Sequence, residues 1–334
     1  MGNTVAFGIR GDAKLRRISC GNVGRGRTAR RLQPPTVTLD AVLPLIENDL
    51  ARSDILFRSL KSRATGIGTL WVVTPNEQRR AIEDHLRRCP PEFAAWRVVG
   101  ETDIVPELAL IRPRGWYRQQ LIKLAIAEHV ESSTYLTLDA DVICTRDFSA
   151  RDLSPDGKPL CYIIPNDWHP DWYRGSVAIL GLSSPRRGIL HNVTPAVLSR
   201  DAVLGLRDHL ERRLLCSGLR GVKQRLALHR GRVTEHSTFS RWRLLLAGGT
   251  PWTEYSLYYT YLEATGQFTK YHTLATHPIY DIDRSIWYAG RPSIQRWNPS
   301  MCFEGAGPPW FVVVQSHTRI PTPEVWRKVE GFLA

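Results

Sequence analysis

Two acidic residues, Asp139 and Asp141, follow an apolar run of β-forming residues that begins at Thr134. Such a run is typical of a strand buried on both faces of a parallel sheet. Open α/β sheets bind ligands at the carboxyl ends of their strands, where these two acids would lie. Where the strand turns into a loop, both carboxylates can converge on one ion, and oxygen ligands of this kind suit Mg²⁺ or Mn²⁺ bridging a diphosphate. The alternative is a strand-end turn with an Asx cap, but burial of two unpaired carboxylates is costly without a cation.

Other residues that could do chemistry lie on predicted helices and at another strand end. Arg118 and Lys123 belong to a predicted helix from Gly115 to about Val130, and either could approach a phosphate or simply face solvent. Glu254 lies in the first turn of a later helix, as a base, an acceptor ligand or a partner of the helix dipole. His317 follows a predicted strand, Trp310–Gln315, and could complete a metal site, although a lone histidine is more often structural.

Two loops have the composition of binding elements. The segment Asn166–Tyr173 is rich in Trp, His and Asp, and includes Asp167, Trp168 and His169. The segment His191–Pro195, with Asn192, is similar in character. Polar and aromatic loops on a rigid scaffold commonly carry function. For most of the eleven tryptophans of the chain, a place in the core is nevertheless the simpler expectation.

The elements that must position these residues alternate between strands and helices. Predicted strands are Thr36–Leu45, Gly68–Thr74, Trp96–Val99 and Cys161–Pro165. Predicted helices are Asn48–Ser62, Asn76–Arg88 with Asn76 as N-cap, and Trp252–Leu262 with Pro251 near its start. This rhythm predicts an α/β fold with a doubly wound, mostly parallel sheet.

Composition narrows the class of protein. The chain has 334 residues, 43% of them hydrophobic, which suffices for one large α/β domain or two halves sharing a cleft. No apolar stretch reaches the roughly 18–20 residues that span a bilayer, and no apolar segment typical of a secretory signal follows the basic N-terminus. The six cysteines form no C-x-x-C pair, which favours reduced thiols and a cytoplasmic location.

The net charge of +13 predicts an anionic partner, such as a phosphorylated substrate, anionic lipid or nucleic acid. Much of the charge lies in residues 1–35, which we expect to be a disordered basic tail. The segment Arg200–Leu246 is also basic and predicted to be helical. It is either a solvated helical surface or a surface for an anionic membrane or a lipid-linked acceptor.

Three blocks resemble a known class of enzymes. The Asp-x-Asp block Tyr135–Val142 resembles that of GT-A-fold glycosyltransferases. Together with Gly115–Leu124 and Trp252–Tyr255, it resembles a bacterial family of unknown function that is expected to be glycosyltransferase-like. The resemblance covers about residues 36–320 and implies a GT-A-like domain. Its nucleotide-sugar half would be residues 36–165, and its acceptor half residues 166–334, with a basic helical insertion at about residues 200–246.

The resemblance also implies roles for individual residues. Asp139 and Asp141 would hold the metal ion, Mn²⁺ or Mg²⁺, with His317 completing its shell. Asp139 would also contact the donor diphosphate, and Glu254 would contact the acceptor or act as the base. Apart from the resemblance, Trp116, Arg118 and Lys123 on the helix that precedes the acidic strand are also expected to bind the donor. The family usually has Glu-Asp where this chain has Glu254-Tyr255, so the base is the weaker assignment. The composition of the two loops, and not the resemblance, is the ground for expecting Asp167, Trp168, His169 and Asn192 to bind the acceptor, and Trp252 is expected to bind it as well.

The function predicted on these grounds is metal-dependent transfer of a sugar from a nucleotide-sugar donor to a glycan or glycolipid acceptor. Bacterial surface polysaccharide or lipopolysaccharide assembly is the expected setting, in the cytoplasm or on the inner face of the membrane, with no nucleic-acid partner. Two alternatives compete. One is a haloacid-dehalogenase-like phosphatase with Asp139 as nucleophile and Asp141 as acid/base, whose nearest late acids are Asp281 and Asp283. The other is a basic membrane-binding or nucleic-acid-binding protein without catalysis.

Overall fold

The computed structural model describes residues 38–333 apart from residues 112, 114, 165–168, 184–193, 217–239, 248–249, 289–293, 306 and 308. Residues Val37–Ala334 form one compact unit, and the predicted basic tail lies outside the described residues. None of the helices described is both long enough and apolar enough to cross a bilayer.

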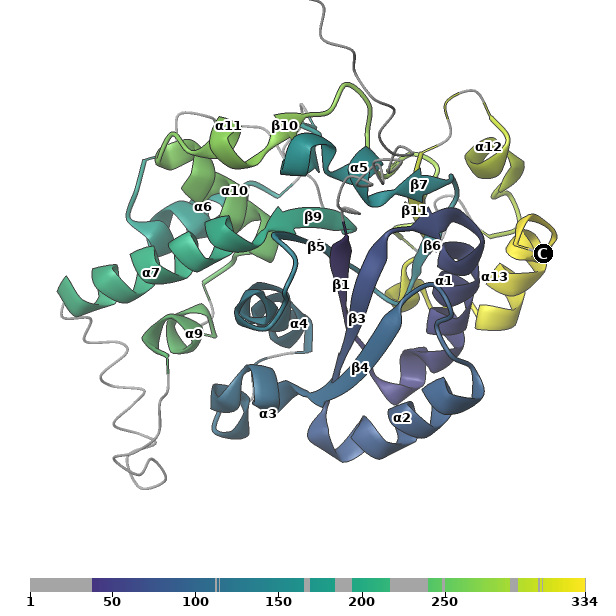
Figure 1. Cartoon of the computed structure of the whole chain (residues 1–334), viewed down its shortest axis with the longest axis horizontal. Coiled ribbons are helices and arrows are strands. Elements are labelled where there is room, and N and C mark those ends of the chain that lie inside the picture. Colours follow the sequence, from purple (N-terminus) through teal and green to yellow (C-terminus); the bar gives the residue numbers. More distant parts are fainter. Residues whose placement is uncertain are drawn as a thin grey trace, which may run out of the picture. The chain divides into compact units, whose positions relative to one another are not determined.

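The core of the fold is a five-stranded sheet with the order β4-β3-β1-β5-β9 (Figure 1). Its strands are β1 (Leu39–Pro44), β3 (Ile67–Thr74), β4 (Ala95–Gly100), β5 (Thr134–Thr137) and β9 (Ala196–Ser199). The first four strands in this order run parallel, and β9 runs antiparallel to β5. The predicted α/β class with a mostly parallel sheet is therefore confirmed.

Alternating side chains of the central strands pack into two separate cores. Leu70 and Val72 of β3 pack with Leu43 of β1 in one hydrophobic cluster. Their neighbours Trp71 and Val73 point into a second cluster on the opposite face. This period of two is the geometry of an extended strand, and it requires helices on both sides of the sheet.

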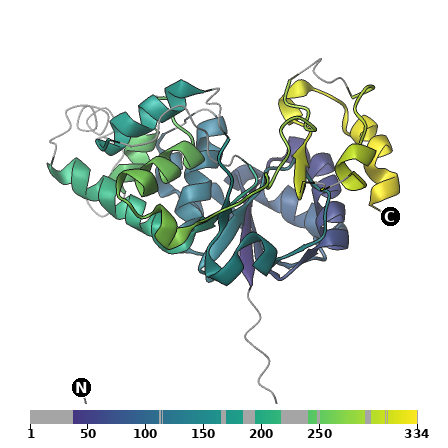
Figure 2. The same cartoon turned by 90° about the horizontal axis from the view of Figure 1, so that it is seen from above.

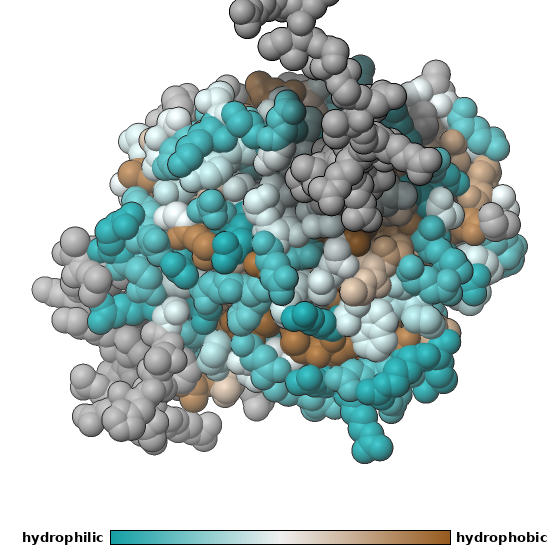
Figure 3. Space-filling model, in the orientation of Figure 1, coloured by the Kyte–Doolittle hydropathy of each residue, from teal (hydrophilic) through white to brown (hydrophobic). Residues whose placement is uncertain are grey.

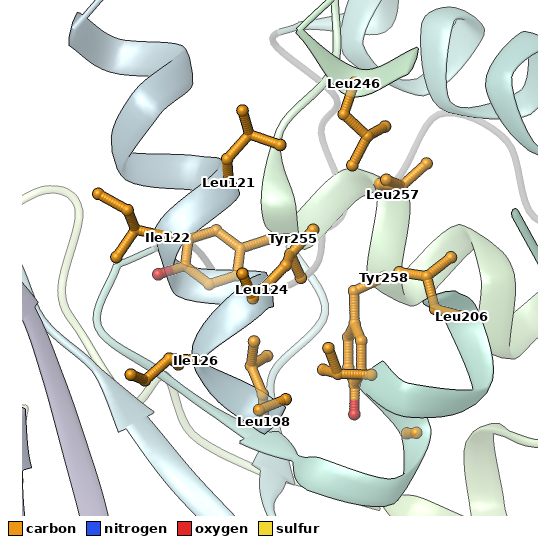
Figure 4. Close-up of a cluster of buried hydrophobic side chains, with 14 of the residues drawn as sticks. Leu121, Ile122, Leu124, Ile126, Leu198, Leu206, Leu246, Tyr255, Leu257 and Tyr258 are labelled. Carbon is orange, nitrogen blue, oxygen red and sulfur yellow. The ribbon is translucent and has the colours of Figure 1, made fainter. Parts of the chain in front are cut away.

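Helices cover both faces (Figure 2). Those on one side are α1 (Leu50–Arg63), α2 (Arg79–Arg88) and, against α1, α13 (Thr322–Val329). Those on the other side are α3 (Glu101–Ile104), α4 (Gly115–Ala125), α6 (Pro170–Leu180), α7 (Arg200–Cys216), α9 (Arg241–Leu246) and α10 (Glu254–Ala264). The second group holds the predicted helical part of the C-terminal half. Tyr255 and Tyr258 of α10 lie in its hydrophobic cluster beside leucines of α4 and α7 (Figure 4).

Short strands extend the fold beyond the main sheet. The pairs are β2 (Ala64–Thr65) with β7 (Phe148–Ser149), β6 (Val142–Cys144) with β11 (Phe311–Val313), and β8 (Leu160–Cys161) with β10 (Thr273–Leu274). Short α-helices are α5 (Ala150–Leu153), α11 (Phe268–Tyr271) and α12 (Ser300–Phe303). Single 3₁₀ turns occur at Glu47–Asp49, Asn76–Gln78, Pro106–Ala109, Ile126–Glu128, Pro155–Gly157, Ser316–Thr318 and Glu330–Phe332.

Two predicted helix starts were wrong. Asn76 does not cap α2, because its side-chain amide donates to Oγ1 of Thr102 at 2.7 Å and the chain makes a 3₁₀ turn first. The helix predicted from Trp252 begins at Glu254 instead. Its N-cap is Thr253, whose hydroxyl accepts the backbone N–H of Ser256 at 2.9 Å, a standard cap for the free amides of a first turn.

Three further predicted elements have different lengths in the structure or extend beyond the described residues. The strand predicted to run from Cys161 to Pro165 is only β8, and the late strand is the three residues of β11. The predicted basic segment is helical over α7 and α9, and residues 217–239 between them lie outside the described part of the chain. The face of the molecule in Figure 3 is mostly hydrophilic, with apolar residues in small separate areas.

Candidate active site

Asp139 and Asp141 lie on the segment that connects β5 with β6. The backbone around them is held on both sides, by a hydrogen bond from Leu138 N–H to the carbonyl of Val42 and by one from Val314 N–H to the carbonyl of Asp141. Asp141 is buried, and its Oδ2 accepts the backbone N–H of Ser316 at 2.8 Å. Its Oδ1 has no hydrogen-bond partner among the described residues.

Lys123 joins Asp139 to Glu254. Its Nζ lies 2.8 Å from Oδ1 of Asp139 and 3.0 Å from Oε1 of Glu254. The side chains of Lys123 and Glu254 are only 3% and 5% exposed, whereas that of Asp139 is 24% exposed. This charged cluster therefore lies under the surface, and Asp139 is the member nearest to solvent.

The elements that carry the charged cluster are anchored to the sheet. The Tyr135 hydroxyl on β5 donates to the carbonyl of Lys123 at 2.8 Å. The hydroxyls of Tyr255 and Thr137 are 2.7 Å apart, which ties α10 to β5. Gln120 of α4 accepts the backbone N–H of Glu254 through Oε1 at 2.9 Å. These bonds place the charges of α4 and α10 beside the carboxyl end of β5.

Burial and neighbouring charges shift the pKa values of these groups. For Lys123, burial alone would lower the pKa, but the carboxylates of Asp139 and Glu254 raise it well above its usual value, so the ammonium stays charged. Burial raises the pKa of Glu254, partly offset by Lys123. Burial, together with the charge of Asp139, raises the pKa of Asp141 to about 7. The carboxylates are therefore held in an environment that favours added positive charge.

These groups open onto one cavity of about 1060 Å³. One part of its wall is aromatic, because the rings of His169 and Trp172 stack with centroids 3.8 Å apart and the ring of Trp116 lies 5.6 Å from that of Trp172. Tyr280, Trp287 and Tyr288 also line the cavity. A volume of this size admits a ligand larger than a single sugar ring.

Several buried polar atoms on the cavity wall have no hydrogen-bond partner within the described part of the chain. They are Nε2 of Gln120, Oδ1 of Asp141, Oγ1 of Thr194, Oη of Tyr280 and Nε1 of Trp287. A buried polar group without a partner is destabilising, and such groups are uncommon in native structures. Their presence on one cavity wall points to a polar ligand there.

The structure brings seven of the sequence-predicted residues onto this cavity. They are Trp116, Lys123, Asp139, Asp141, His169, Glu254 and His317. His317 is exposed, and its Nδ1 lies 2.9 Å from Oε1 of Gln315. Asp167, Trp168 and Asn192 lie outside the described residues.

Two predicted binding residues are placed elsewhere. Arg118 is not part of the cavity wall, because its guanidinium makes a two-point ion pair with Glu101, including an Nε–Oε2 bond of 3.0 Å. Trp252 is fully buried, and its indole N–H donates to the carbonyl of Leu246 at 2.8 Å. Its ring packs 6.1 Å from that of Tyr117, so it belongs to the core behind the aromatic wall.

Sequence reasoning did not select several residues of the cavity wall. Gln120 precedes Lys123 by three positions, so helical spacing could have placed both on one face of α4. Trp172 follows His169 by three positions at the start of α6, and the same spacing applies. Asp49 and Tyr280 come from distant parts of the chain, and no local signal identifies them.

The acids fit a divalent cation by donor type, but no metal shell is assembled in advance. Oδ1 of Asp141 is a buried oxygen without a hydrogen-bond partner in the described part of the chain, and Asp139 is an adjacent oxygen donor on the same cavity. Hard cations prefer such oxygens. Among the described residues, however, no group of three His, Cys, Asp or Glu side chains is close enough to hold a metal ion.

The fold and the cavity define an α/β protein with a polar cavity at the carboxyl end of its mostly parallel sheet. The chain belongs to the family of unknown function DUF6492, whose model matches residues 36–334. No curated protein sequence matches the chain.

Solved structures offer distant similarities. The apo form of mouse xyloside xylosyltransferase 1 is 12% identical, covering 86% of this chain and 100% of its own, with a TM-score of 0.47. The galactosyltransferase LgtC in complex with donor and acceptor sugar analogues is 14% identical, covering 83% and 87%, with a TM-score of 0.38. An active-site mutant of LgtC is 16% identical, covering 64% and 71%, with a TM-score of 0.34.

Proposed function

We propose that this protein is a metal-dependent, GT-A-like glycosyltransferase that moves a sugar from a nucleotide-sugar donor to a glycan or glycolipid acceptor. The observation that carries the proposal is the composition of the cavity. The same space is lined by carboxylates at a strand end, by an aromatic wall and by neutral polar groups that have no hydrogen-bond partner among the residues described. A nucleotide sugar has chemical groups suited to each feature. Its diphosphate would bind the carboxylates through a cation, its hydroxyls would pair with the neutral polar groups, and rings of the donor or the acceptor would pack on the aromatic wall.

Asp139 and Asp141 would hold Mn²⁺ or Mg²⁺, and the exposed His317 would reach the ion from the rim of the cavity. The cation would act as a Lewis acid that neutralises charge on the leaving nucleoside diphosphate. It would also compensate the carboxylates, whose environment already favours positive charge. Lys123 cannot take this role alone, because its single positive charge is already shared between Asp139 and Glu254.

Glu254 is the residue of the cavity best placed to act on the acceptor. In an inverting reaction, it would take the proton of the acceptor hydroxyl while the bond from the sugar carbon to the diphosphate breaks and the bond to the acceptor oxygen forms. Burial raises its pKa, which strengthens it as a base. Lys123 and the backbone bond to Gln120 hold it in place. The aromatic rings of Trp116, His169 and Trp172 would form a platform for the acceptor.

We further propose that the acceptor belongs to bacterial surface polysaccharide or lipopolysaccharide assembly, with the enzyme at the inner face of the membrane. The net charge of +13 supports association with anionic lipid. Sedimentation with vesicles that contain anionic lipid, compared with neutral vesicles, tests this part separately.

The first experiment is a thermal-shift screen with UDP, GDP, CDP and dTDP, each with and without Mn²⁺. A ligand at about a hundred times its dissociation constant stabilises the native state by about 2.7 kcal/mol, which is readily measured. A shift with one nucleotide only when Mn²⁺ is present supports the proposal and names the donor class. The absence of any shift, or rapid hydrolysis of simple phosphate esters, would contradict it.

A further inference from the structure

The side-chain amide of Gln120 has a defined orientation, in which its oxygen accepts a hydrogen bond and its NH₂ group has no acceptor among the described residues. Gln120 is 1% exposed and lines the cavity. Its Oε1 accepts the backbone N–H of Glu254, the first residue of α10, at 2.9 Å. Because only the oxygen can accept that hydrogen bond, Nε2 must be the other end of the amide. Nε2 has no acceptor among the described residues.

The charges around Gln120 disfavour a phosphate as the missing partner. Lys123 contributes one positive charge, and Asp139 and Glu254 contribute two negative charges that contact it directly. The sum is negative, so a diphosphate would be attracted here only through the proposed cation at Asp139 and Asp141, and not through the Gln120 amide. A neutral group is the better partner for the Gln120 amide.

A hydroxyl group of the ligand would meet the hydrogen-bonding requirements of the groups beside Gln120. It can accept a hydrogen bond from Nε2 of Gln120 and donate its own hydrogen to a carboxylate of the cluster. A carbonyl could only accept, which would leave the carboxylates without a donor from the ligand. On the wall of the same cavity, Thr194 and Tyr280 have hydroxyls without a hydrogen-bond partner among the described residues. Such hydroxyls can both donate to and accept from a neutral, hydroxyl-rich molecule.

We propose that Gln120 binds a hydroxyl of the transferred sugar and is a specificity-determining residue for the donor. This inference rests on the proposed glycosyltransferase function and refines it. It places the sugar beside the charged cluster formed by Lys123, Asp139 and Glu254. The diphosphate would lie at the cation that Asp139 and Asp141 hold. The geometry thus gives Lys123 a role in holding the site together rather than in binding phosphate.

The test compares two dissociation constants in each variant. The wild type is titrated with the nucleoside diphosphate that binds best of UDP, GDP, CDP and dTDP, with Mn²⁺ present. It is then titrated with the glucose, galactose, N-acetylglucosamine and mannose conjugates of that nucleotide. The quantity of interest is the ratio of the dissociation constant of the tightest conjugate to that of the diphosphate.

Gln120→Met is expected to raise this ratio about tenfold, the effect of losing one hydrogen bond to a neutral group. Gln120→Glu retains an oxygen for the N–H of Glu254 but removes the amide donor, and it is expected to raise the ratio as well. Should Gln120→Met fail to fold, Gln120→Glu decides the question. The matched control is Gln78→Met, because Gln78 also accepts a backbone N–H, that of Glu47 at 2.8 Å, but lies away from the cavity.

The outcomes separate this inference from the proposed function. If Gln120 served only to support α10, both dissociation constants would change together and the ratio would stay constant, which overturns the inference and leaves the function intact. If the wild type binds the diphosphate and no conjugate, the inference is likewise overturned. If the wild type binds none of these nucleotides, the proposed function fails, and the inference with it.

Discussion

The ammonium of Lys123 lies 3.0 Å from the carboxylate of Glu254, although 131 positions separate the two residues in the chain. Both side chains are buried, and the ion pair links α4 to α10 beneath the cavity surface. The same ammonium also contacts Asp139 at the end of β5. One lysine thereby aligns groups from three elements.

Replacement of this lysine should be strongly destabilising. Lys123→Met would leave Asp139 and Glu254 without their counter-ion, and breaking a buried ion pair by removing one partner costs about 3–5 kcal/mol. Adding Glu254→Gln to the same chain should recover part of that loss, because one uncompensated charge disappears. Urea unfolding of the wild type, the single variants and the double variant measures both effects. Strictly additive free energies would show that the two residues are not coupled.

Replacement of Asp141 should affect ligand binding more than folding. Asp141→Asn keeps the size of the side chain and an oxygen for the backbone N–H of Ser316. It removes a carboxylate proposed to hold the cation. We expect the Mn²⁺-dependent thermal shift with the nucleotide to disappear while the melting temperature without ligand does not fall. An unchanged Mn²⁺-dependent shift would remove Asp141 from the metal site.

His317 allows a surface test of the metal site. The side chain is exposed at the rim of the cavity, so His317→Ala should leave the free energy of unfolding unchanged within about 0.5 kcal/mol. We expect a weaker apparent affinity for Mn²⁺, measured by titration in the presence of the nucleotide. His277→Ala is the matched control, because His277 is exposed and is not part of the cavity wall. Equal Mn²⁺ affinities of the two variants would exclude His317 as a ligand.

Arg118 should contribute to the stability of the fold and not to nucleotide binding. Its partner Glu101 is 7% exposed on its side chain, and removal of the arginine would leave that buried carboxylate unpaired. Arg118→Leu is expected to cost on the order of 1–3 kcal/mol of unfolding free energy and to change nucleotide affinity less than about twofold. A large loss of nucleotide affinity with unchanged stability would restore Arg118 to the donor site.

Trp172 tests the aromatic wall. In Trp172→Ala, the stacked partner of His169 and the neighbour of Trp116 are lost together. We expect the KM for a saccharide acceptor to rise by up to about tenfold, in line with roughly 0.5–1.5 kcal/mol for an aromatic contact, while hydrolysis of the donor in the absence of acceptor keeps its rate. A matching loss in donor hydrolysis would place the ring in the donor site instead.

The parts of the fold that local patterns determine were predictable. Buried strands such as β1 and β3 have runs of apolar residues long enough to be recognised, and their alternation with helices indicates the parallel sheet. Helix starts were predicted less well. The side chain of Asn76 bonds to Thr102, 26 residues further on, and this tertiary contact overrides its local tendency to cap a helix.

The same distinction applies to the site. Asp139 and Asp141 could be recognised because burying acids at the end of an apolar strand is costly without a compensating charge. Glu254 could be recognised by its position at the start of a helix. The pairing of Lys123 with both carboxylates was not predictable, because it depends on how α4 and α10 meet. Arg118 and Lys123 have similar local sequence signals, and only their tertiary partners, Glu101 and the cavity carboxylates, separate them.

Asp139 and Asp141 occupy the one short segment that leaves the five-stranded sheet at β5 and enters the separate β6–β11 pair. A cation bound by both acids would act as a crosslink between two independently hydrogen-bonded units. We therefore expect Mn²⁺ to slow amide hydrogen exchange in β11, at Val312 and Val313, some 170 residues away along the chain from the ligands themselves. Binding of the metal in the cavity would then also change the local stability of β11, near the C-terminus.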